Sequence, residues 1–174
     1  VNRKKKLKKV KNQFLITSHP YMQDRSSFQS RCGSDMKFNW KLEDKSLAYK
    51  RLQMWWDEHK AFDNKHIPYN SMPKRIFTVS TEVENVELDL YSIGIIITDT
   101  DICWVGWITS NPFAEPKYKV GALKYLYEII SVVMKSQGFE FMVSHAKEKS
   151  LMNALKNSGF DLIEPETNFY IKNL

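Results

Sequence analysis

Two cysteines and four histidines are the side chains of this chain that could bind a metal ion or carry thiol chemistry. Cys32 and Cys103 lie far apart and form no Cys-x-x-Cys or Cys/His pattern, so neither a disulfide framework nor a zinc site is indicated. The histidines show no ligand spacing, and each is expected to be an ordinary structural or surface residue; they are His19, His59, His66 and His145. We therefore predict no metal site and a reducing compartment.

A second chemical feature is the positive charge at the start of the chain. Residues 1–11 hold seven cations and no acid: Arg3, Lys4, Lys5, Lys6, Lys8, Lys9 and Lys11. The rest of the chain is nearly neutral, because the whole chain has 26 cations, 20 acids and a formal net charge of +6. Such a tail suits an acidic partner, either nucleic acid or an assembly partner protein. A nuclear-type signal or a simple aid to solubility is the competing interpretation.

The bulk composition predicts one folded domain with an extension. A chain of 174 residues with 43% apolar and 13% aromatic content can bury a substantial core. No apolar run approaches the roughly 18 residues that cross a bilayer, and the first residues lack the apolar stretch of a secretory signal. We expect a protein that lies in the cytoplasm or within a virion and does not contact a membrane.

The elements that must position any site begin after residue 45. Residues 1–45 form a basic tail and an irregular extension with scattered aromatics, which suggests that the extension packs on the domain or on a neighbour. From residue 46 the apolar period becomes helical over about four turns, with Asp44 or Ser46 as the cap. Two adjacent tryptophans, Trp55 and Trp56, cannot both enter one narrow core, so one is expected at an interface or cleft rim.

Short strands and a hairpin follow this helix. Residues 75–80 are rich in β-formers, and the acidic stretch after them, which contains Glu82, Glu84, Glu87 and Asp89, reads as a solvated connection. The strongest hairpin signal joins residues 91–98 to residues 102–109 through the polar turn Asp99-Thr100-Asp101. These segments predict the central antiparallel strands.

The last third of the chain predicts two more helices and two more strands. Apolar residues recur at three and four positions from 120 to 134, and Gly138 ends this long helix. A strand at 139–143, a shorter helix around 151–155 closed by Gly159, and a strand at 168–171 complete the pattern.

This order of elements resembles the core of the GNAT superfamily of acyl-CoA-dependent N-acetyltransferases. The resemblance covers roughly residues 74–174, with the helix from residue 46 in the place of that family's first helix. It implies an α/β (α+β) fold, with a mixed, mainly antiparallel sheet flanked by helices. The domain is expected to span residues 46–174.

The resemblance also implies a cofactor loop. In that family the fourth strand leads into Arg/Gln-x-x-Gly-x-Gly/Ala, whose amides and following helix hold the pyrophosphate of coenzyme A. The matching stretch is Lys117-Tyr118-Lys119-Val120-Gly121-Ala122. We expect Lys117, Lys119, Val120, Gly121 and Ala122 to contact acetyl-CoA if it binds. Valine replaces the first glycine, so its branched side chain is expected to intrude on the phosphate and weaken binding.

The family's proton donor is replaced. Aligning on the pair Gly159-Phe160 puts Glu148 at the family's helix-start Asn and Leu155 at its Tyr, and leucine cannot donate a proton to the departing thiolate. A water molecule could take over that role, as could one of three side chains: Tyr118, Ser144 or His145. Each of these three also has an ordinary structural interpretation, in a helix end or a strand-to-helix turn.

Two functions remain open on these residues. The first is a GNAT-fold protein that has lost catalysis and serves as a binding or structural subunit of a larger assembly. Residues 150–160 resemble small accessory virion proteins of bacteriophages, and the basic tail would dock on an acidic partner. The second is an active acetyl-CoA-dependent N-acetyltransferase. We favour the first, because the loop and the proton donor are both altered.

Overall fold

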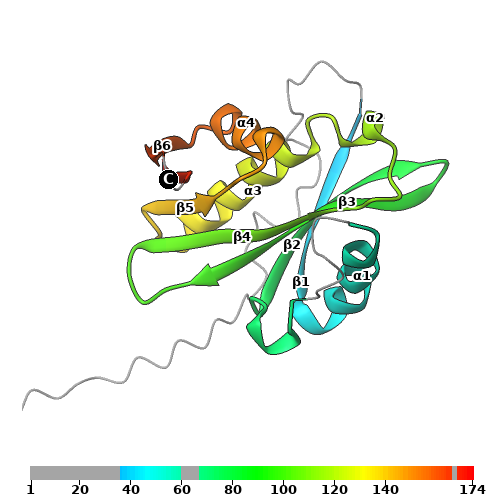
Figure 1. Cartoon of the computed structure of the whole chain (residues 1–174), viewed down its shortest axis with the longest axis horizontal. Coiled ribbons are helices and arrows are strands. Elements are labelled where there is room, and N and C mark those ends of the chain that lie inside the picture. The colour runs from blue at the N-terminus through cyan, green and yellow to red at the C-terminus, as the bar shows by residue number, and fades with distance from the viewer. Residues whose placement is uncertain (1–35, 60–66, 166–167) are drawn as a thin grey trace, which may run out of the picture.

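The computed structural model describes residues 36–59, 67–165 and 168–174, which form one seven-stranded sheet with helices on both faces (Figure 1). The strands lie in the order β1-β2-β3-β4-β5-β7-β6, and every neighbouring pair is antiparallel except β4 with β5. This confirms the predicted mixed, mainly antiparallel sheet. The strands are β1 (Phe38–Asp44), β2 (Arg75–Val83), β3 (Val86–Ile97), β4 (Ile102–Ser110), β5 (Phe141–His145), β6 (Asp161–Glu164) and β7 (Phe169–Asn173). The helices are α1 (Lys45–Glu58), the 3₁₀ turn η3 (Tyr69–Ser71), α2 (Pro116–Lys119), α3 (Ala122–Ser136) and α4 (Lys149–Asn157).

Strand β1 lies in the part of the chain that we expected to be irregular. Its seven residues pair with β2 in continuous antiparallel register, and Trp40 stacks on Phe77 with ring centroids 6.0 Å apart. The interpretation of residues 13–45 as an irregular extension was therefore wrong for β1, and the domain boundary at residue 46 was placed too late. The mixed composition of β1 gives no clear strand pattern in the sequence. This segment forms a strand because it pairs with β2, which supplies its hydrogen bonds and its apolar contacts.

Two hairpins form the centre of the sheet. The one between β3 and β4 turns at residues 99–101, as predicted. The one between β2 and β3 was missed, since the acidic stretch there is not a solvated connection but two paired strand ends. Glu84 and Asn85, with φ of 51° and 64°, form the turn between them. Positive φ at both central residues is the signature of a type I′ turn, which Asn tolerates well.

Two apolar clusters lie on opposite faces of the sheet. Ile76 and Phe77, neighbours on β2, belong to different clusters, as the alternation of a strand requires. The Ile76 cluster packs under α1 and includes both Trp55 and Trp56, which are only 3% and 1% exposed. The expectation that one of them lies at an interface or cleft rim was therefore wrong. Helix α1 covers its sheet face with an apolar sector wide enough for both rings.

The second cluster joins α3 and α4 to the other face and follows the predicted element order. Gly138 and Gly159 come just after α3 and α4 with φ of 88° and 81°, the left-handed conformation that ends a helix. Strand β5 begins two residues later than predicted, and β6 was not anticipated. Only one of the four residues of β6 is even partly buried, so this edge strand carries no apolar run that a sequence pattern could reveal.

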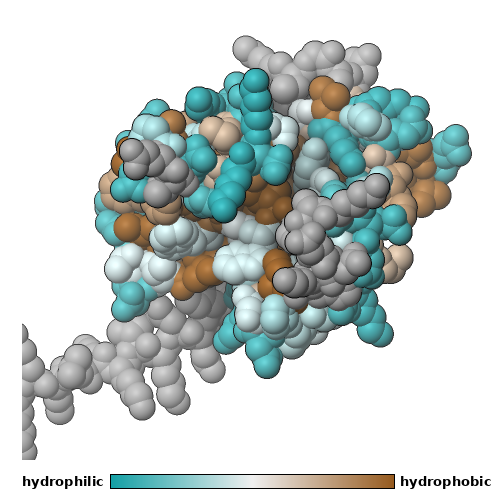
Figure 2. Space-filling model, in the orientation of Figure 1, coloured by the Kyte–Doolittle hydropathy of each residue, from teal (hydrophilic) through white to brown (hydrophobic). Residues whose placement is uncertain are grey.

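The surface seen in Figure 2 is mainly hydrophilic, with hydrophobic residues in separate areas between the polar ones. Large apolar side chains that are exposed come from different elements, for example Leu47 on α1, Val132 on α3 and Ile163 on β6. Single exposed apolar side chains of this kind are common on folded domains.

Candidate functional site

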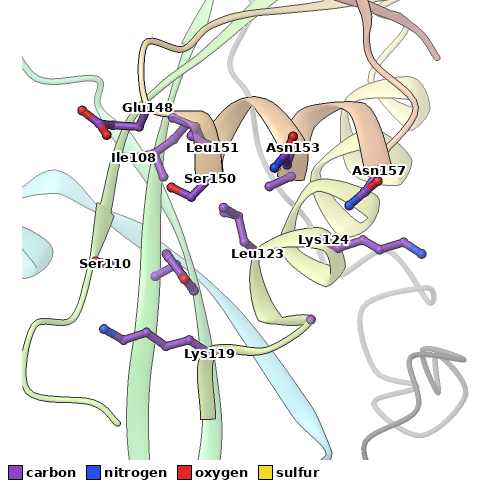
Figure 3. A pocket seen from close by; sticks show the side chains of 13 residues that line it. Ile108, Ser110, Lys119, Leu123, Lys124, Glu148, Ser150, Leu151, Asn153 and Asn157 are labelled. Carbon is purple, nitrogen blue, oxygen red and sulfur yellow. The ribbon is translucent and has the colours of Figure 1, made fainter. Parts of the chain in front are cut away.

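A cleft of about 520 Å³ lies between the second half of β4, the start of α3 and the length of α4. Its walls combine apolar side chains such as Ile108 and Leu123 with polar ones on α4 (Figure 3). This size and mixed lining suit a small molecule with both apolar and polar parts.

The cleft exists because β4 and β5 separate. The two strands pair in parallel from Ile102↔Phe141 to Val105↔Ser144. Beyond that pair β5 ends at His145, whereas β4 continues to Ser110. In the part of the chain that the structure describes, the continuing half of β4 therefore has no strand on the side of β5. The side-chain hydroxyl of Ser144 donates to the carbonyl oxygen of Val105 at 2.9 Å where the pairing stops.

A bulge in β4 directs the side chains of Ile108 and Ser110 into this cleft. From Ser92↔Thr109 to Gly94↔Gly106 the register advances two residues on β3 and three on β4, and Trp107 has a φ of 50°. One extra residue reverses the alternation of a strand. As a result Ile108 packs against the same core cluster as Val105, although the two are an odd number of positions apart and would lie on opposite faces of a regular strand. Ser110 lines the cleft with Ile108.

The start of α3 opens into the same cleft. Gly121 precedes the helix with a φ of 79°, and no side chain of the described residues caps the helix start. The first amides of a helix lack partners within it, and together with the helix dipole they favour an anion. Gly121 also lines the cleft, so the start of α3 borders it.

Two lysines flank this helix start. Lys119 and Lys124 both line the cleft, and Lys124 makes a long pair with Glu128 at 3.8 Å. Burial lowers the pKa of Lys119, and among the described residues no carboxylate pairs with its ammonium. A partly desolvated lysine beside free helix amides is an arrangement that an anion stabilises.

The other members of the predicted cofactor loop lie elsewhere. Lys117 forms an exposed pair with Glu115 at 2.9 Å and does not line the cleft. Ala122 is fully buried in the core. Val120 is 61% exposed and is not part of the cleft wall. The expectation that its side chain intrudes on a bound phosphate stays a prediction. The separate turn α2 directs this valine outward.

None of the three suggested catalytic side chains lines this cleft. Tyr118 packs against the core with its ring 4.7 Å from the ammonium of Lys117. Ser144 is fully buried in its bond to the Val105 carbonyl, and His145 is exposed at the end of β5. Their roles stay predictions.

Several lining residues were not identified from the sequence. Tyr91 reaches the cleft from β3, and burial raises the pKa of its phenol. Helix α4 adds Ser150, Asn153 and Asn157, which Figure 3 shows on the side of the cleft opposite Lys119. Glu148, placed earlier at the family's Asn position, lines the cleft at the start of α4. The helical period of α4 could have indicated its polar face, but no local pattern pointed to Tyr91.

The basic tail, with its seven cations, lies outside the described residues, as do His19, Cys32 and His66. Within the described ranges no helix is long and apolar enough to cross a membrane. No group of three or more His, Cys, Asp or Glu side chains in those ranges is arranged to hold a metal ion.

Comparison with known proteins gives a result at the level of structure only. No model of a known protein family and no curated protein matches the sequence. A domain from Methanocaldococcus jannaschii DSM 2661 matches with a TM-score of 0.60 and 15% identity, over 80% of this chain and 100% of that one. An acetyltransferase of the GNAT family from Staphylococcus aureus Mu50 matches with a TM-score of 0.59 and 16% identity, over 79% and 99%. The yncA protein of Salmonella typhimurium, solved with its cofactor acetyl-CoA, matches with a TM-score of 0.55 and 11% identity, over 79% and 94%.

These matches confirm the resemblance at the level of the fold. The chain has the GNAT fold, and at these identities the likeness extends to the fold alone.

Proposed function

We propose, from the GNAT fold of this chain, that the cleft binds an acyl-CoA and that the protein transfers the acyl group to an amine. One observation carries the proposal: the start of α3 and the partly desolvated Lys119 border the same cleft, and within residues 36–59, 67–165 and 168–174 no side chain caps the one and no carboxylate pairs with the other. Backbone amides and an ammonium at one place match the pyrophosphate of coenzyme A. The acyl-bearing arm of the cofactor would then follow the half of β4 that extends beyond β5.

The energies support anion binding at this place. A helix start stabilises an anion by about 0.3–1 kcal/mol when exposed and up to about 2 kcal/mol when partly buried. Lys119 adds a charge-assisted hydrogen bond, worth about 1.5–3 kcal/mol. Glu148 is the carboxylate among the described lining residues, and it is our candidate to accept the proton that the amine must lose.

A thermal shift with acetyl-CoA tests the cofactor, because a ligand that binds only the native state raises the melting temperature. At a hundredfold excess over Kd the stabilisation is about 2.7 kcal/mol. Isothermal titration then gives the affinity of wild type, Lys119→Glu and Lys117→Glu. We expect Lys119→Glu to weaken binding at least about tenfold. Lys117→Glu makes the same charge change two residues away and outside the cleft, so it should leave the affinity within about twofold.

The transfer itself needs its own measurement. Release of free CoA from acetyl-CoA is followed with a thiol reagent in the presence of a panel of primary amines, and mass spectrometry identifies the acetylated product. Binding without any release of CoA would limit the function to cofactor binding.

A second candidate function rests on Leu155. It stands where the family places its proton-donating tyrosine, and it is fully buried. This favours a binding or structural subunit that keeps the GNAT fold without catalysis, in a larger assembly such as a virion, with the basic tail on nucleic acid or an acidic protein. Deleting residues 1–12 should then weaken assembly or nucleic-acid retention and remove its salt dependence. Unchanged behaviour of the deletion would contradict the docking role.

A further inference from the structure

An apolar row crosses the side of the sheet that carries α1. Its four members are direct neighbours on β3, β4, β5 and β7: Ile96, Trp104, Val143 and Ile171. Cys103 and Val105, on either side of the β4 member, belong to the core cluster on the other side of the sheet, so alternation turns the row toward the side of α1. The cluster under α1, as far as the chain is described, includes none of the four. A sheet face that stays in solvent usually carries polar side chains, so this row indicates a covered surface.

Two aromatic rings form a ridge on this surface. Trp104 on β4 and Phe169 on β7 meet edge to face, with ring centroids 5.2 Å apart. Strand β5 lies between β4 and β7 in the sheet, so the two rings meet over β5, where Val143 is only 4% exposed. Trp104 is itself 40% exposed, and its neighbour Ile96 is 39% exposed. This aromatic ridge therefore presents apolar surface to the outside.

An open space lies next to the aromatic ridge, over Gly106. Gly106 follows Trp104 by two residues on β4, so it faces the same side, and a Cβ there would meet no atom of the described residues within 4 Å. Its partner on β3, Gly94, is covered by Pro73, whose Cγ would lie 2.7 Å from a Cβ on Gly94. Pro73 and the ridge thus border the open space. Glycine inside a strand often marks a place that another chain approaches closely.

The same surface is almost without charge. Alternate residues of β5, of β7 and of β4 before its bulge face this side, and in these described strands none of them is Asp, Glu, Lys or Arg. The whole chain carries a formal net charge of +6, so two copies repel each other on average. An uncharged apolar surface is a place where two copies can meet without bringing like charges together.

The shape of the surface also suits a second copy. A twofold axis makes each copy contribute the same patch, so the patch must be complementary to itself. A ridge beside an open space meets this requirement, because the ridge of each copy can enter the open space of the other. Packed sheets interdigitate their side chains in this way at a separation of about 10 Å.

We propose that this surface is an interface between two copies of the chain, which pack sheet against sheet about a twofold axis. The aromatic ridge of one copy lies over Gly106 of the other, and Ile96 borders the contact. Trp104, Phe169 and Gly106 do not line the cleft, so the dimer does not depend on the proposed acyl transfer.

Sedimentation equilibrium of the full chain over a concentration series tests the dimer. Trp104→Glu places a carboxylate on the ridge. Because the twofold axis uses the ridge twice, we expect the dissociation constant of the dimer to rise at least about a hundredfold. Gly106→Lys fills the open space and should have the same effect.

Phe113→Glu is the matched control. It makes the same charge change as Trp104→Glu at an aromatic side chain that is 61% exposed in the loop before α2. A surface change outside the interface should leave the dissociation constant within about twofold of wild type.

The fold of each variant is checked by circular dichroism and thermal melting at a concentration where wild type is monomeric. If Trp104→Glu does not fold, Gly106→Lys decides, because it removes no side chain from the domain. A wild type that stays monomeric at its highest soluble concentration would overturn the inference, since another occupant would then cover the row. A dimer that Gly106→Lys leaves intact would overturn it too, as would an equal weakening by Phe113→Glu.

Discussion

The guanidinium of Arg51 on α1 donates a hydrogen bond to each carboxylate oxygen of Glu43 on β1, with Nη1 3.1 Å from Oε1 and Nη2 2.6 Å from Oε2. Arg51 also pairs with Asp89 at 2.9 Å and bonds the hydroxyls of Thr78 and Ser92. This network joins α1 to three neighbouring strands, β1, β2 and β3. It explains why β1 belongs to the domain and not to a loose extension.

Glu43→Gln should destabilise the fold, because it leaves the half-buried Arg51 without one of its two carboxylates. Breaking a fully buried pair costs about 3–5 kcal/mol, and the partial exposure here reduces our expectation to about 2 kcal/mol. Thermal unfolding should show a melting point lower by about 4–8 °C. Glu58→Gln, an exposed change at the end of the same helix, is the control. Equal effects of the two changes would contradict the role of the pair.

The contribution of Glu43 should disappear in acid. Burial of Glu43 opposes its ionisation, but hydrogen bonds from Arg51 and Thr78 outweigh it and hold the pKa below its ordinary value. A carboxylate with a lowered folded pKa stabilises the fold above its unfolded pKa, about 4.3, and loses that contribution as the pH falls through the folded pKa. Urea unfolding of wild type and Glu43→Gln should therefore differ most above about pH 5 and converge below about pH 4. A difference that is constant with pH would refute this.

Gly94→Ala should be destabilising and Gly106→Ala neutral, although the two glycines are partners on β3 and β4. A Cβ on Gly94 would lie 2.7 Å from Cγ of Pro73, whereas one on Gly106 would meet no atom of the described residues within 4 Å. Overpacking of this kind costs about 1–3 kcal/mol. Denaturant unfolding of the Gly94→Ala and Gly106→Ala variants measures this cost. Similar free energies of unfolding for the two variants would show that Pro73 can move aside.

Cofactor binding should weaken as the pH rises, and it should do so at a lower pH than if Lys119 had the pKa of an ordinary lysine. Burial lowers the pKa of Lys119, so its charge is lost as the pH rises through that lowered value, and attraction for phosphate is lost with it. Titration with acetyl-CoA between about pH 8 and 10.5 should show the loss in wild type. Lys119→Arg should keep its affinity, since arginine stays charged. If the affinities of wild type and Lys119→Arg fell in parallel with pH, Lys119 would not be the residue that binds the cofactor phosphate.

Local patterns were sufficient for much of the fold. The polar turn at residues 99–101 between two β-rich runs, the three-and-four period of α3 and the helix-ending Gly138 and Gly159 all act within a few residues of the chain. Turn chemistry and helical periodicity need no distant partner, so the sequence alone determined these elements and, with their order, the GNAT-like architecture.

The site depended on contacts that no local pattern contains. Lys119 and Gly121 were named from the sequence, but Tyr91 joins them only because β3 pairs with the half of β4 that extends beyond β5. Likewise Val120 points outward because the chain turns at α2.

By itself, the sequence determined the helices α1, α3 and α4, the β3–β4 hairpin and their order, because propensity, period and turn residues are short-range properties. The tertiary structure alone decided that β1 is a strand, that Trp55 and Trp56 are both buried, and that a cleft opens where β4 and β5 separate. Each of these results depends on side chains far apart in the chain, whose pairing becomes favourable only when the whole sheet has brought them together.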